Sequence, residues 1–159
     1  MSIRQLSAVV LALGSFAVGI SVGPGLAGVQ PASADAIADG VATLPGSVED
    51  VRIGGTWERD GKSGAYRIVV SRSGGDTVTA RMFVQWVAYQ DDGSATVEDS
   101  VEIQEIADLK VDIVDFNSES DADGLSVFIQ TLDPNGTADQ NYELFVTSPT
   151  QHRFGPASN

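Results

Sequence analysis

Apolar and polar side chains alternate along most of the chain after residue 48, and a period of two is that of a β-strand. The clearest stretch is 77–90, where one phase holds Val78, Ala80, Met82, Val84, Trp86 and Ala88. Val, Ile, Thr, Tyr and Phe, which favour strands, are frequent in this region. The pattern predicts an all-β domain, and we expect Trp86 to anchor its core.

Turn-forming residues divide the region into about seven or eight short strands. The strands are expected at residues 48–59, 65–72, 77–90, 95–106, 109–116, 125–132 and 142–147. Gly54-Gly55 and a phase slip at Ile113-Val114 indicate β-bulges. No segment of the region shows the 3.6-residue period of an amphipathic helix.

Short strands separated by turns are typical of two architectures. The first is an antiparallel β-sandwich, immunoglobulin-like in general architecture. The second is a small up-and-down barrel of the calycin type. We favour the sandwich, and the sequence leaves the strand order open.

The first 34 residues follow the pattern of a secretory signal peptide. Arg4 precedes an apolar run at 6–22 without an ionisable side chain, and small residues lead to Ala32-Ser33-Ala34. As a helix, the run would reach only about 25 Å, short of the roughly 30 Å core of a membrane. We therefore expect cleavage after Ala34 and a periplasmic or secreted protein, with an uncleaved anchor as the alternative.

The sequence predicts four segments. They are a signal peptide at 1–34, a flexible leader at 35–47, a β domain at 48–148 and a C-terminal tail at 149–159. The β domain is large enough for one hydrophobic core and too small for two. The chain has no cysteine, which excludes disulfides, thiolate chemistry and a lipid anchor.

The formal net charge of −13 is unevenly distributed. Between residues 91 and 143, Lys110 is the only basic side chain among many acidic ones, whereas basic residues prevail at 52–81. A negative field repels phosphate backbones and anionic lipids, so nucleic-acid binding is excluded and no stable membrane insertion is expected after cleavage. An acidic surface either keeps an exported protein soluble or attracts a cation or a basic partner.

One acidic segment has the composition of a calcium loop. Oxygen-bearing side chains occupy alternate positions and precede Gly124; they are Asp115, Asn117, Glu119, Asp121 and Asp123. The segment resembles the start of a D-x-D-x-D-G calcium loop, although Gln130 stands where a distal glutamate belongs. The other interpretation, which we favour, is an acidic turn between two strands. No other cofactor is expected.

Several strands carry an aromatic residue in the phase opposite to their main apolar set. These residues are Phe83, Tyr89, Phe128 and Phe145. The outer phase of a two-layer sandwich should be polar. The rings therefore either shield apolar surface beneath loops or the leader, or form an exposed patch that binds a protein partner.

The chain has few of the groups that catalysis requires. His152 is the only histidine and lies in the predicted tail, so a serine triad or a histidine metal site has little support. Carboxylates are too many for one acid–base pair to stand out. No glycine-rich loop precedes a helix as a phosphate site requires. We therefore expect a protein without catalytic activity.

Gly55-Thr56-Trp57 resembles the G-x-W opening of lipocalin-type and avidin-type barrels. In those families the tryptophan closes one end of the barrel, and the following strands enclose a small apolar ligand. The resemblance implies a carrier in which Trp57 and Trp86 line the interior. Our main hypothesis is an exported, non-enzymatic binding or structural module of the bacterial envelope, and the apolar-ligand carrier is the alternative.

Overall fold

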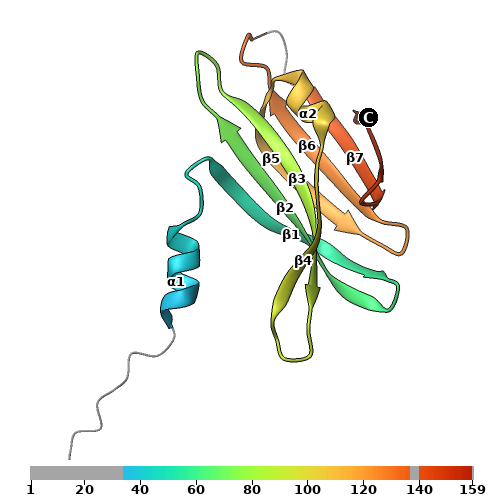
Figure 1. Ribbon diagram of the computed structural model, residues 1–159. Helices are drawn as coiled ribbons and strands as arrows, with labels where there is room; N and C mark the ends of the chain where they lie inside the picture. Colours follow the sequence, from blue (N-terminus) through green and yellow to red (C-terminus); the bar gives the residue numbers. More distant parts are fainter. Residues whose placement is uncertain (1–33, 137–139, 159) are drawn as a thin grey trace, which may run out of the picture. The chain divides into compact units, whose positions relative to one another are not determined.

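A computed structural model describes residues 34–136 and 140–158 (Figure 1). The chain divides after Val41 into two units, each of which is described by itself. In the first lies most of helix α1 (Ala34–Ala42), so the predicted leader contains a helix. Ile37 and Val41 of α1 are four residues apart and both are exposed. Apart from Ala34, the predicted signal peptide lies outside the described residues.

The second unit contains two four-stranded antiparallel sheets, which confirms the predicted all-β class. The first sheet holds β1 (Val48–Arg59), β2 (Lys62–Ser73), β3 (Thr79–Tyr89) and β4 (Ala95–Glu102). The second sheet holds β5 (Asp112–Ser120), β6 (Leu125–Leu132), β7 (Gln140–Ser148) and β8 (Gln151–Pro156). Strand β8 forms an edge and comes from the predicted tail.

In each sheet the strands follow one another in sequence order (Figure 1). Immunoglobulin domains instead interleave strands from different parts of the chain by Greek-key connections. The two sheets are therefore consecutive meanders. Each forms from strands that are neighbours along the chain.

Both predicted bulges are confirmed. The β1–β2 register shifts between Ile53 and Gly55, and the β5–β6 register shifts between Ile113 and Asp115. A further shift occurs in the β3–β4 pair, where Glu98 of β4 is the extra residue. Because a bulge bends its strand and increases its twist, the shift in β4 changes the direction of the strand at this point.

The prediction of a strand over 95–106 is wrong in its last four residues. Strand β4 ends at Glu102, and a short helix, α2 (Gln104–Leu109), follows it. Ile103 and Ile106 are both completely buried, and their spacing of three residues is that of a helical turn. Neither helix in the described part of the chain is long and apolar enough to span a membrane.

Both sheets contribute to a single hydrophobic core. The first sheet supplies Trp57, Tyr66, Ile68, Met82, Val84 and Trp86, among others. The second sheet supplies Phe116, Leu125, Val127, Ile129, Leu144 and Val146, among others. Trp86 is 2% exposed, which confirms its predicted place in the core. The shared core is what a β-sandwich requires.

Strands β1 and β5 come close together and link the two sheets. The guanidinium of Arg52 donates hydrogen bonds to the Asp115 carboxylate at 2.9 Å and to the Phe116 carbonyl at 2.8 Å. The backbone N–H of Thr56 donates to the Ser120 hydroxyl at 3.0 Å. Gly55 permits this approach, because a Cβ at its position would collide with the Ser120 side chain. The β5–β6 turn is thereby held beside the end of β1.

Candidate ligand-binding site

A cavity of about 900 Å³ opens beside the β1–β2 hairpin and the β5–β6 turn. Its walls come from β1, β2 and the end of β3 in the first sheet, and from the turn and Thr147 of β7 in the second. The close approach of β1 and β5 therefore places residues from both sheets around one space. The volume lies within the range of small-molecule sites in proteins.

Three aromatic side chains of the core extend to the base of the cavity. Trp57, Tyr66 and Trp86 line it, with 6%, 5% and 2% of their surfaces exposed. The Tyr66 and Trp86 rings meet edge to face with centroids 5.6 Å apart, and the Trp57 indole N–H donates to the Ala65 carbonyl at 3.2 Å. Packing and hydrogen bonding thus fix the three rings without a ligand.

The rim of the cavity is acidic. Asp60 comes from the β1–β2 turn, and Asp121 and Asp123 come from the β5–β6 turn. One oxygen of Asp121 accepts the backbone N–H groups of Asp123 at 2.8 Å and Gly124 at 3.1 Å, which fixes the turn. Among the residues that the structure describes, the side chains of Asp60 and Asp123 have no hydrogen-bond or ion-pair partner. Both carboxylates are therefore available to a ligand.

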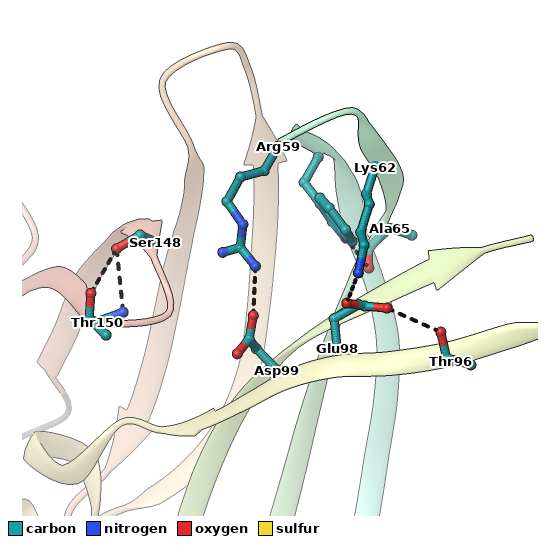
Figure 2. A network of polar contacts seen from close by, with 9 residues as sticks. Arg59, Lys62, Ala65, Thr96, Glu98, Asp99, Ser148 and Thr150 are labelled. Carbon is teal, nitrogen blue, oxygen red and sulfur yellow. Dashed lines mark hydrogen bonds and ion pairs between the residues drawn. The ribbon is translucent and has the colours of Figure 1, made fainter.

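Arg59 is the one basic side chain among the lining residues, and it pairs with Asp99 of β4. Its guanidinium lies 2.7 Å from the Asp99 carboxylate and 5.8 Å from the centre of the Trp57 ring. Nearby, the ammonium of Lys62 lies 2.6 Å from the carboxylate of Glu98 (Figure 2). These two ion pairs connect the β1–β2 hairpin to β4 at the opposite edge of the first sheet, where the bulge bends the strand.

The pKa of the Tyr66 hydroxyl, at the base of the cavity, is raised. Burial is the main cause that raises this pKa, and the negative charge of Asp121 raises it further. A hydrogen bond with Trp86 and the positive charge of Arg59 lower it, but the net shift is upward. Tyr66 is therefore neutral at physiological pH, and the charges of Arg59 and Asp121 both act on its hydroxyl.

The structure does not gather the five residues of the predicted calcium loop around one point. Asp115, Asn117 and Glu119 lie on β5, where alternate side chains are about 7 Å apart. Asp115 is bound by Arg52, which is the main reason that its pKa is lowered. Over residues 34–136 and 140–158, no three His, Asp or Glu side chains form a group that could hold a metal. Calcium binding stays a prediction without a preformed site in these residues.

The four aromatic residues of the predicted patch lie in different places. Phe83 is on the outer side of the first sheet, and Tyr89 is exposed at the rim of the cavity. Phe128 and Phe145 are on the outer side of the second sheet, where Phe128 is 42% exposed. Arginine side chains cover two of the rings, since Arg81 lies over Phe83 and Arg153 over Phe145. The four rings do not form one surface.

Sequence reasoning placed several of the cavity residues but did not bring them together. The sequence predicted Trp57 at one end of a barrel, and Asp121 and Asp123 in a calcium loop or an acidic turn. Compared with protein-family models, with curated proteins and with solved structures, the chain has no significant match.

Proposed function

We propose that this protein is an exported, non-enzymatic binding module of the bacterial envelope, and that its ligand occupies the cavity beside the β1–β2 hairpin. The observation that carries this proposal is the cavity of about 900 Å³, in which both tryptophans of the chain meet an acidic rim. The rings and the turn are held in place by the protein itself, so little conformational entropy of the protein is lost when a ligand binds.

A carrier that encloses an apolar ligand has less support. Its ligand would occupy the interior between the sheets, but that space is filled by buried side chains such as Ile68, Val84 and Trp86. The cavity is instead open to the surface and bordered by carboxylates. Burying a charged rim against an apolar molecule would be unfavourable.

The absence of catalysis is also part of the proposal. His152 forms a pair with Glu105 at 3.1 Å and does not line the cavity. Export is supported by the pattern of the first 34 residues. Fractionation of the native bacterium tests export: we expect the protein in the periplasm or medium with Asp35 as its first residue, and a cytoplasmic protein that still begins with Met1 would contradict it.

Native mass spectrometry of protein purified from its own envelope tests ligand binding. We expect a retained ligand that quenches or shifts tryptophan emission, since Trp57 and Trp86 line the cavity. Ala122→Phe adds a ring to the cavity wall and should reduce ligand retention by more than about tenfold. Asn135→Phe is the matched control, because Asn135 is exposed in the β6–β7 connection, away from the cavity. Equal retention by both variants, or no ligand and no response to envelope extracts, would contradict the proposal.

A further inference from the structure

We infer that the cavity binds an organic cation, an ammonium or a guanidinium group. This assignment rests on the proposed function and adds the chemical class of the ligand. Three observations carry it: the aromatic residues of the cavity, the available carboxylates of its rim, and the contacts that the guanidinium of Arg59 makes beside it.

The first observation is the base of the cavity. Trp57, Tyr66 and Trp86 lie at its inner end, and Tyr89 is at the rim with more than half of its surface exposed. The faces of aromatic rings carry partial negative charge and attract cations, with tryptophan the most effective. A cation that enters the cavity therefore meets the exposed ring of Tyr89 at the rim, and only small exposed parts of the three inner rings.

The second observation is the electrostatic balance of the rim. Arg59 is already paired with Asp99 at 2.7 Å, whereas Asp60 and Asp123 have no partner among the described residues. Asp121 adds a third carboxylate to the lining, and one of its oxygens already accepts two backbone N–H groups. An anion would be repelled by this rim, and the net charge of −13 adds to that repulsion at long range.

The third observation is Arg59 itself. Its guanidinium lies between the Trp57 ring, at 5.8 Å, and the Asp99 carboxylate. The protein thus already holds one organic cation between an aromatic ring and a carboxylate at this end of the sheet. The cavity next to it offers the same two kinds of contact, with the exposed Tyr89 as the ring and the aspartates of the rim as carboxylates.

Two probes of equal size, one cationic and one neutral, test this inference. N-acetylarginine amide carries a guanidinium, and N-acetylcitrulline amide replaces it by an uncharged urea group. Binding is followed by calorimetry and by the emission of Trp57 and Trp86 at low ionic strength. We expect the arginine probe to bind at least about tenfold more tightly than the citrulline probe, and the difference to shrink as salt is added.

Two pairs of variants show where the probe binds. Asp121→Asn with Asp123→Asn should weaken binding of the arginine probe by about fivefold or more, because two attractive charges are lost and asparagine can still cap the turn. The control, Glu119→Gln with Glu143→Gln, removes the same total charge from residues that do not line the cavity and should change affinity by less than about twofold. Arg59→Ala should tighten cation binding, since it removes a repelling charge and frees Asp99.

The cation could belong to a free small molecule or to a side chain of a protein partner. A peptide with a central arginine, compared with the free probe, distinguishes the two. An affinity for the peptide at least about tenfold higher indicates a basic partner, and equal affinities indicate a free cation.

Equal or tighter binding of the citrulline probe, or loss of binding in Arg59→Ala, would overturn the inference. If neutral or anionic molecules bind instead and Ala122→Phe blocks them, the proposed function survives and the cation assignment fails. If no probe and no envelope extract changes the emission of Trp57 and Trp86, both fail.

Discussion

Gly55 permits the approach of β1 to β5 that holds the cavity together, so replacing it should have a large effect. Its φ of +128° is strained for any side chain, which costs about 1–2 kcal/mol. An added Cβ would also push the Ser120 side chain away and break its hydrogen bond with the Thr56 N–H, at a further cost of about 1 kcal/mol. We therefore expect Gly55→Ala to lower the free energy of unfolding by about 3 kcal/mol.

Gly61→Ala is the matched control, because Gly61 also has a positive φ, of 75°, but a Cβ there would meet no atom within 4 Å. Only the backbone strain applies, so we expect a loss of about 1 kcal/mol. Urea unfolding followed by tryptophan emission measures both. With a slope of about 1.5 kcal/mol per M, the midpoints should fall by about 2 M and about 0.7 M.

A double variant separates strain from collision. Gly55→Ala with Ser120→Gly removes the side chain that the new Cβ meets, so it should be more stable than the sum of the two single changes predicts. A midpoint for Gly55→Ala equal to that of Gly61→Ala would refute the reasoning, because it would mean that β5 does not press against β1. If the losses of the two single variants simply add in the double variant, the collision between the new Cβ and the Ser120 side chain is refuted, but the backbone strain at position 55 is not.

Three further predictions concern stability. Ile106→Ala should cost about 2–4 kcal/mol in urea unfolding, because Ile106 of α2 is completely buried in the core and its truncation leaves a cavity; a loss below about 1 kcal/mol would contradict this. Arg52 lowers the pKa of Asp115, so their pairing stabilises the fold above pH about 4, and this stabilisation is lost as the pH falls through the pKa of the folded state. The difference in unfolding free energy between wild type and Arg52→Gln should therefore narrow between pH 7 and pH 3. A constant difference would contradict this linkage. Lys62→Ala should cost less than about 1 kcal/mol, because its pair with Glu98 lies at the surface, and a larger loss would show that the hairpin depends on it.

The strand pattern was readable from the sequence because it depends on local alternation. In β3 the side chains of Met82, Val84 and Trp86 are buried and those between them are not, as the phase predicts. Both predicted bulges also follow from local features, a glycine pair and a phase slip. Helix α2 was missed because its six residues are too few to show a helical period, and only the burial of both Ile103 and Ile106 in the core distinguishes it from a strand end.

The sequence by itself determined the all-β class, the strand phases and the acidic character of the protein, since these depend on residue type and short-range order. The tertiary structure alone decided the strand order and the cavity, because Tyr66, Trp86 and Asp121 come from three separate segments of the chain. Their meeting depends on the pairing of β2 with β3 and on the approach of Gly55 to Ser120. Contacts between segments so far apart leave no periodic signal along the chain, and this is why the candidate site had to be found in the folded protein.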